Sequence, residues 1–220
     1  MSKANPSAPK WSPARPILCL VVNRGERGDS LASTLAEACS GGVDWVHLRD
    51  RKLEGSAWLE WAEELAGAAR LGAAEVRILV NRRIDVALAL GADGAHLGFD
   101  ALEPRDARRL LGDDALLGVS THGLAEIRTL SPREVDYVHL APIYDPHSKP
   151  ASRPALGPGV LAEACSQEIP VIAQGGLDPG RCSAVIRAGA AGIAVTGAIL
   201  HAPDPAKAAA GLRAALDSAG

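Results

Sequence analysis

Eight short apolar runs recur along this chain, and each is followed by a stretch with helical patterning. Alternating strands and helices predict a parallel sheet, and eight repeats predict that the sheet closes into a barrel. The predicted strands are 17–22, 45–48, 76–80, 94–97, 116–119, 137–140, 171–173 and 192–195. We therefore expect a single-domain (β/α)8 TIM barrel over residues 16–220, preceded by a flexible tail over residues 1–15.

The stretches between the runs are amphipathic, for example 30–40, 56–71 and 105–111. Pro104 precedes the last of these, at a position where a helix start tolerates proline. A doubly wound open sheet is the main alternative to the barrel. The chain has no GxGxxG motif after its first run, which argues against a dinucleotide-binding sheet.

Composition excludes several classes of protein. The 220 residues carry a formal net charge of −3 and show no basic stripe, so we expect no nucleic-acid partner. No apolar run reaches the length of a membrane span, so we expect no membrane contact. The four cysteines form neither a close pair nor a zinc-binding spacing, which favours free thiols in a cytoplasmic protein.

The last two apolar runs end in glycine, in the stretches 171–176 and 192–197. Glycine allows a ligand to approach the backbone closely, and the loops after strands seven and eight of a TIM barrel commonly hold a phosphate. We therefore expect a phosphorylated small molecule as ligand. The predicted phosphate-binding residues are Gly175, Gly176, Val195, Thr196 and Gly197.

Polar residues follow several other runs, where the C-terminal strand ends of a barrel meet around one active site. These residues are His47, Arg49, Arg51, Asn81, Arg82, Arg83, His96, Ser120, Thr121 and His122, with Lys149 in a proline-rich loop over 141–157. Each also has a structural interpretation. Arg49 is then a solvated strand end, His96 a hydrogen-bonded histidine at the edge of the core, His122 a helix cap and Lys149 plain surface. His139 and His201 look structural.

The order of these motifs resembles the thiamine phosphate synthase/TenI superfamily over residues 16–215. The segments that carry the resemblance are 46–49 (VHLR), 79–82 (LVNR), 91–98 (GADGAHLG), 118–122 (GVSTH), 141–144 (APIY) with Lys149, 173–177 (AQGGL) and 189–195 (GAAGIAV). The resemblance implies a TIM barrel, a small phosphorylated thiazole as ligand and a homodimer.

Two positions depart from the synthase branch of that superfamily. Synthases join a thiazole phosphate to a hydroxymethylpyrimidine diphosphate, and Mg²⁺ neutralises the leaving pyrophosphate. Their pattern places an aspartate where this chain has Arg82 and another where it has Ala101. Mg²⁺ prefers carboxylate oxygens, so an arginine is no substitute as a ligand. An Arg82/Arg83 pair could instead hold the pyrophosphate charge without metal.

TenI-type proteins lack those carboxylates, and the resemblance then implies a metal-independent thiazole tautomerase. That reaction moves one proton, and the resemblance assigns the acid/base role to His122. The predicted substrate-binding residues are Arg49, Asn81, His96, Ser120 and Lys149, with the substrate carboxylate facing Arg49, Asn81 or Lys149. We expect no cofactor. The alternatives are a thiamine phosphate synthase with an altered pyrophosphate and Mg²⁺ site, and a non-catalytic regulatory barrel that binds a phosphorylated ligand.

Overall fold

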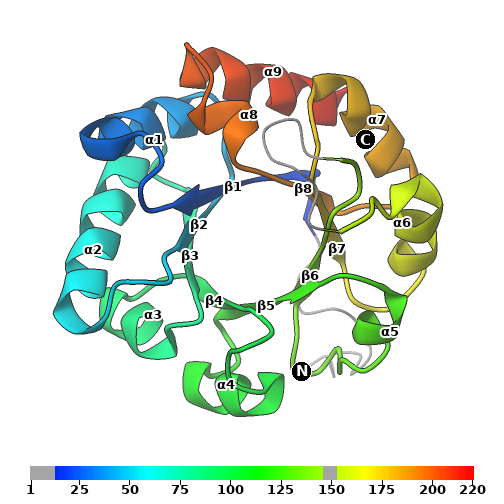
Figure 1. Cartoon of the computed structure of the whole chain (residues 1–220), viewed down its shortest axis with the longest axis horizontal. Helices are drawn as coiled ribbons and strands as arrows, with labels where there is room; N and C mark the ends of the chain where they lie inside the picture. The colour runs from blue at the N-terminus through cyan, green and yellow to red at the C-terminus, as the bar shows by residue number, and fades with distance from the viewer. Residues whose placement is uncertain (1–12, 146–152) are drawn as a thin grey trace, which may run out of the picture.

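The computed structural model describes residues 13–145 and 153–220, and it contains a closed barrel of eight parallel strands (Figure 1). Each strand pairs with the next along the chain, and the last pairs with the first. The strands are β1 (Ile17–Asn23), β2 (Trp45–Arg49), β3 (Arg77–Asn81), β4 (Gly94–Leu97), β5 (Leu116–Thr121), β6 (Tyr137–Leu140), β7 (Val171–Gln174) and β8 (Gly192–Val195). The predicted TIM barrel is confirmed.

Helices surround the barrel on its outside, as Figure 1 shows. They are η1 (Gly28–Ser30), α1 (Leu31–Ser40), α2 (Gly55–Gly72), α3 (Ile84–Leu90), α4 (Pro104–Leu111), α5 (Leu124–Ile127), α6 (Gly157–Cys165), α7 (Pro179–Arg187), α8 (Gly197–Leu200) and α9 (Pro205–Asp217). Two helices begin with the same dipeptide, Asp178-Pro179 and Asp204-Pro205. In both, the aspartate side chain accepts a backbone N–H three residues later and proline occupies the first turn.

Several strands end one or two residues later than predicted. Arg49, Asn81, Thr121 and Gln174 each close a strand, although the apolar runs stop before them. Arg49 and Gln174 are partly exposed, whereas Asn81 and Thr121 are buried and hydrogen-bonded. A polar residue in either setting ends the apolar run without ending the strand, so hydrophobicity underestimates strand length there. β3 also begins one residue later than predicted, at Arg77.

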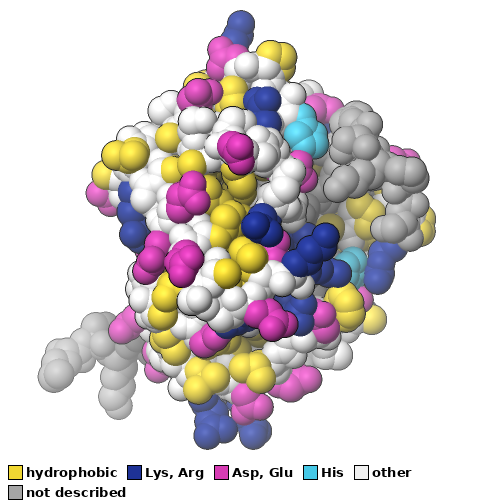
Figure 2. Space-filling view, turned by 60° about the vertical axis from the view of Figure 1, so that its left-hand side comes forward, with side chains coloured by type: hydrophobic (Ala, Val, Ile, Leu, Met, Phe, Trp, Pro, Cys, Tyr) yellow, Lys and Arg dark blue, Asp and Glu magenta, His cyan; other side chains and the backbone are white. Residues whose placement is uncertain are grey.

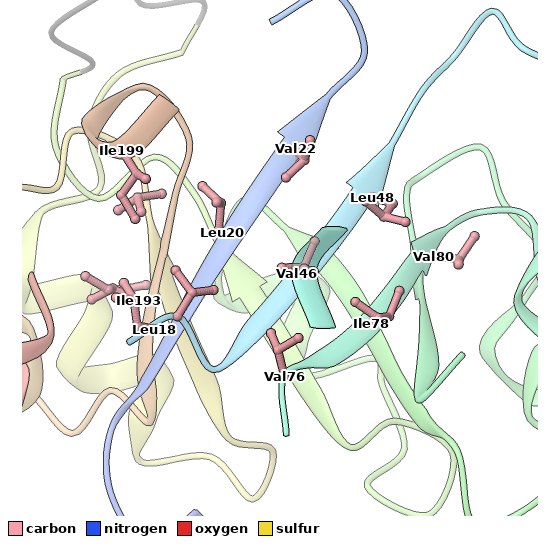
Figure 3. Close-up of a cluster of buried hydrophobic side chains, with 14 of the residues drawn as sticks. Leu18, Leu20, Val22, Val46, Leu48, Val76, Ile78, Val80, Ile193 and Ile199 are labelled. Carbon is pink, nitrogen blue, oxygen red and sulfur yellow. The ribbon is translucent and has the colours of Figure 1, made fainter. Parts of the chain in front are cut away.

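Alternate strand residues pack on opposite sides of the barrel wall. The outward set packs with helix residues in one cluster between strands and helices, of which Figure 3 labels Leu18, Leu20, Val22, Val46, Leu48, Val76, Ile78, Val80, Ile193 and Ile199. A second cluster comprises Ile17, Cys19, Val21, Trp45, Leu79, Leu116, Tyr137, Ile172 and Ala194. In the layered packing typical of TIM barrels, the side chains of this second set fill the interior, which is a packed core and no channel.

Three aspartates precede alternate strands at the N-terminal end of the barrel. Asp44, Asp93 and Asp136 stand directly before β2, β4 and β6. Each carboxylate accepts a backbone N–H from the preceding strand, at 2.8 Å from Leu18, 2.8 Å from Ile78 and 2.7 Å from Leu117. We call these three residues the foot aspartates. They tie neighbouring strands together at the end opposite the glycine-terminated loops.

In the described part of the chain, no helix combines the length and apolarity needed to cross a membrane. All four cysteines are free thiols. Of the predicted tail over residues 1–15, residues 1–12 lie outside the described part.

Candidate active site at the C-terminal end of the barrel

The C-terminal ends of β2 and β3 bring four arginines to one side of the barrel mouth. Arg49 ends β2, Arg51 follows it, and Arg82 and Arg83 follow β3. Arg51, Arg82 and Arg83 line one hollow, together with Asp50, Glu54 and Asp100. We call Arg49, Arg51 and Arg82 the arginine rim. On the face shown in Figure 2, Lys and Arg side chains are interspersed with Asp and Glu, without a continuous basic surface.

Arg49 is half-buried, and its Nη1 donates to Asn23 Oδ1 at 2.6 Å. Burial lowers the pKa of this guanidinium, and the neighbouring charge of Arg51 lowers it further. The Arg82 charge acts in the same direction, while Asp100 and Asp50 oppose it. A cation that is partly removed from water beside other cations favours an anionic ligand, which would supply the missing counter-charge.

Arg82 occupies a left-handed backbone conformation, with φ of 64°, directly after β3. Its Nη1 lies 3.0 Å from Asp100 Oδ2. Two other acids of this side, Asp50 and Asp85, are engaged as well. Asp50 Oδ1 accepts the backbone N–H groups of Lys52 and Leu53, and Asp85 pairs with Arg83.

A magnesium site, which resemblance to the synthase branch alone implies, needs free carboxylate oxygens. Asp100 directly precedes Ala101, where the synthase pattern has an aspartate, and its carboxylate is paired with the guanidinium of Arg82. The residue that follows Asn81 is itself a cation. The two positions where the synthase pattern has aspartates, Arg82 and Ala101, therefore do not fit a carboxylate-bound Mg²⁺. The arginine rim suits direct binding of an anion.

Asn81, His96 and Ser120, three of the predicted substrate-binding residues, lie close together but deeper than expected. His96 is fully buried, and its Nε2 and Nδ1 lie 2.9 Å from Ser120 Oγ and 3.1 Å from Tyr137 Oη. Asn81 is only 4% exposed, and its Oδ1 lies 3.2 Å from the Nε2 of His47. Of these three predicted residues, only Ser120 is partly exposed. His96 supports Ser120 from below and does not reach the mouth.

His47, His96 and His139 form a buried layer beneath these residues. They come from β2, β4 and β6, and their ring centroids lie 4.3 to 5.7 Å apart. Burial lowers the pKa of His47 to about 4, and it lowers the pKa of His96 and His139 well below the usual value. All three rings are therefore neutral at pH 7. The sequence interpretation of His139 as structural missed this cluster, because only barrel closure brings alternate strands together.

The predicted phosphate site has two glycines that the chain needs for its own packing. Gly175 and Gly176 adopt φ of 98° and 60°. A Cβ on Gly176 would lie 2.4 Å from the carbonyl oxygen of Asp145, and one on Gly175 would lie 2.8 Å from Pro142. On the neighbouring strand, Val195 ends β8. Thr196 is the N-cap residue of α8, and Gly197 is its first residue. The five predicted residues thus occupy the two adjacent strand ends expected for them.

His122 follows β5 and is about one-quarter exposed. Its backbone N–H donates to Glu126 Oε2 at 2.9 Å, and its ring Nδ1 lies 3.5 Å from the same oxygen. The N-cap of α5 is Gly123, and in these contacts the Glu126 side chain accepts from His122, so His122 is not the capping residue of α5. Its acid/base role stays a prediction. Lys149 lies outside the described residues.

Comparison with known proteins decides which superfamily this site belongs to. Residues 18–199 match the family model of thiamine monophosphate synthase (TMP-TENI). The chain belongs to this family. A thiamine-phosphate synthase of Mycobacterium sp. (strain KMS) is 41% identical over 97% of both chains. Another from Azorhizobium caulinodans is 40% identical, over 91% of this chain and 95% of its own length.

Two further comparisons agree with this membership. A bifunctional thiamine biosynthesis protein, ThiM/ThiE of Symbiobacterium thermophilum, is 39% identical over 91% of this chain, which spans 40% of that longer protein. Among solved structures, a thiamine phosphate pyrophosphorylase from Pyrococcus furiosus superposes with a TM-score of 0.80 at 25% identity, over 92% of this chain and 96% of that one.

These relatives overturn the predicted thiazole tautomerase. Relatives 34–41% identical over most of the chain are named thiamine-phosphate synthase, so the synthase alternative is the better supported activity. The prediction was wrong because it took the missing carboxylates at Arg82 and Ala101 as loss of the pyrophosphate site. The structure has the arginine rim at the same place, and guanidinium groups also bind phosphate oxygens. The relatives likewise favour an enzyme over a purely regulatory barrel.

Proposed function

We propose that this protein is a thiamine-phosphate synthase, which joins a thiazole phosphate to a hydroxymethylpyrimidine diphosphate and releases pyrophosphate. The observation that carries the proposal is the 41% identity to a named synthase over 97% of both chains. The barrel mouth supports it, because the glycine-terminated ends of β7 and β8 and the arginine-rich ends of β2 and β3 lie at the same end of one closed parallel barrel. One substrate brings a phosphate and the other a diphosphate, so two anion sites are required.

The charge of the two sites suggests which substrate each would bind. The thiazole phosphate would bind at Gly175, Gly176 and the Val195–Gly197 segment, where backbone groups approach a ligand closely. The diphosphate would bind at the arginine rim, where Arg49 lacks sufficient counter-charge. Ser120, held by His96, would contact the substrate between the two anion sites.

Pyrophosphate is a good leaving group only when its developing negative charge is stabilised. In this chain the fixed guanidinium charges of Arg49 and Arg82 would provide that stabilisation. Arg82 would exchange its ion pair with Asp100 for the diphosphate, because both are oxygen anions and the bond to Asp100 is partly exposed. We propose that the reaction needs no added metal.

The test is an assay of the purified protein with both substrates in buffer freed of divalent cations, with and without added Mg²⁺. We expect thiamine phosphate to form in both, with rates that differ by less than about tenfold, because fixed guanidinium groups supply the electrostatic stabilisation. Absence of product under both conditions would contradict the synthase proposal. Product only with Mg²⁺ would keep the synthase and reject the metal-free diphosphate site.

A further inference from the structure

Three buried histidine side chains face one another inside the barrel, below the arginine rim. His47, His96 and His139 can each present one ring nitrogen so that the three atoms lie within 4.8 Å of one another. The rings are 0–3% exposed. In the described part of the chain, this is the one group of three or more His, Cys, Asp or Glu side chains with such proximity.

Two of these rings have a nitrogen without a hydrogen-bond partner. His47 donates its Nε2–H to Asn81 Oδ1, which leaves Nδ1 as a bare lone pair, and that atom is buried and unpaired. Nε2 of His139 is also buried and unpaired. A buried polar atom without a partner costs about 1–3 kcal/mol, so such an atom in a folded protein usually has a water molecule or an ion as its partner.

We propose that His47, His96 and His139 bind a transition-metal ion of the Zn²⁺ class inside the barrel. Imidazole nitrogens suit Zn²⁺, Co²⁺, Ni²⁺ and copper, whereas Mg²⁺ and Ca²⁺ prefer oxygen. Three neutral histidines are also the protein ligands of one class of zinc site, which keeps a fourth position for water. The site is distinct from the diphosphate site at the arginine rim.

The geometry needs only small adjustments. A zinc–nitrogen bond of roughly 2.0–2.1 Å places tetrahedral ligand atoms about 3.3 Å apart. The three ring nitrogens now lie within 4.8 Å of one another, so each ring needs to move by less than about 1 Å to reach that separation. His96 must release one of its two hydroxyl partners, Ser120 or Tyr137, and either hydroxyl can then hydrogen-bond elsewhere.

The surroundings resemble those of metal-binding histidines in general. Such a histidine usually gives its second ring N–H to an oxygen acceptor, which fixes the orientation of the ring and its tautomer. His47 has that partner in Asn81. One ring nitrogen of His96 keeps a hydroxyl partner when the other binds the metal. The three ligands come from three strands, so an ion would link β2, β4 and β6.

The experiment uses the full chain, stripped of metal with a chelator and titrated with Zn²⁺ and with Co²⁺. We expect one equivalent to bind, a visible absorption band for Co²⁺ with nitrogen ligands, and a higher unfolding temperature with Zn²⁺. The variants His47→Gln and His139→Gln should each weaken Zn²⁺ binding more than tenfold. Even loss of an outer partner of a metal-binding histidine costs roughly 10–100-fold.

The matched control is His201→Gln, which makes the same change at a half-exposed histidine paired with Glu26. Its Zn²⁺ affinity should equal that of the unmodified protein. Circular dichroism establishes that each variant is folded. Equal affinity in all three variants would overturn the proposal, and so would the absence of the Co²⁺ band in the unmodified protein, a measurement that depends on no variant.

Discussion

Arg82 combines an unusual backbone with a place at the barrel mouth. Its φ of 64° belongs to the left-handed region, which side chains other than glycine adopt rarely and aspartate and asparagine tolerate best. Such a conformation persists where the surroundings enforce it, often at functional sites. The guanidinium is thereby directed to Asp100 and to the hollow lined by Arg51 and Arg83.

Arg82→Asp therefore tests the metal-free diphosphate site at a single residue. We expect the rate in metal-free buffer to fall about tenfold or more, since one charge-assisted hydrogen bond is worth about 1.5–3 kcal/mol. Added Mg²⁺ should restore part of the rate, because the new carboxylate supplies an oxygen ligand. The control is Arg109→Asp, which makes the same substitution at an exposed arginine of α4 and should leave the rate unaltered. An unchanged metal-free rate in Arg82→Asp would exclude Arg82 from diphosphate binding.

Gly176 illustrates how a ligand-binding turn can also be required by packing. Gly176→Ala would place a Cβ 2.4 Å from the Asp145 carbonyl oxygen in a residue with φ of 60°. We expect a loss of about 1–3 kcal/mol in the free energy of unfolding and a higher KM for the thiazole phosphate. The control Gly67→Ala lies in α2 with open space around it and should stabilise the protein by about 0.5–1 kcal/mol. Equal stabilities of the two variants in urea would contradict this assignment.

At the scale of elements, the pairing of β5 with β6 depends on a buried ion pair. Arg108 on α4 lies 2.5 Å from Asp136, and it also donates to the carbonyl oxygens of Gly112, Ala115 and Glu134. Arg108→Ala leaves a buried carboxylate without its cation, and we expect a loss of about 3–5 kcal/mol in stability. The adjacent Arg109 is 75% exposed, so Arg109→Ala should change stability by less than about 0.5 kcal/mol. Urea unfolding of both variants measures the difference, and a similar midpoint for the two would refute it.

The elements themselves were largely predictable from the sequence. Eight apolar runs gave the eight strands in order, because strands buried on both faces read as continuous hydrophobic segments. Their ends were predicted short at Arg49, Asn81 and Gln174, since a polar residue at the mouth interrupts the run without interrupting the strand. The histidine layer was not predictable, because its members come from three strands and only register and closure bring them together.

The activity shows the limit of reading a site by matching single positions. Two missing carboxylates favoured a tautomerase, whereas the relatives are named synthases. The negative charge of a leaving pyrophosphate can be neutralised by a metal ion or by guanidinium groups. The absence of metal-binding carboxylates therefore does not exclude the reaction. The arginines were visible in the sequence, but their gathering on one side of the mouth depends on the pairing of β2 with β3.

At the scale of the whole molecule, all four thiols belong to the packed interior or its edge. Burial raises the pKa of Cys39 to about 12 and that of Cys165 and Cys182 to about 11, and it raises the pKa of Cys19 further. Because the thiolate is the reactive form, native protein at pH 8 should react with a thiol reagent far more slowly than urea-unfolded protein. All four thiols should react once the chain unfolds. Rapid modification of Cys19, Cys39 or Cys182 in the native state, located by mass spectrometry, would contradict this packing.

The foot aspartates have a consequence for how such a protein can change over time. They fix strand pairing at the end of the barrel that is remote from the mouth, through backbone contacts that no substrate shares. Mutations among the loops at the opposite end, outside the packed glycines Gly175 and Gly176, can then alter substrate preference without disturbing these contacts. A library that randomises Arg51, Arg82 and Asp100 while leaving the foot intact is a natural starting point for directed evolution of new transferases on this scaffold.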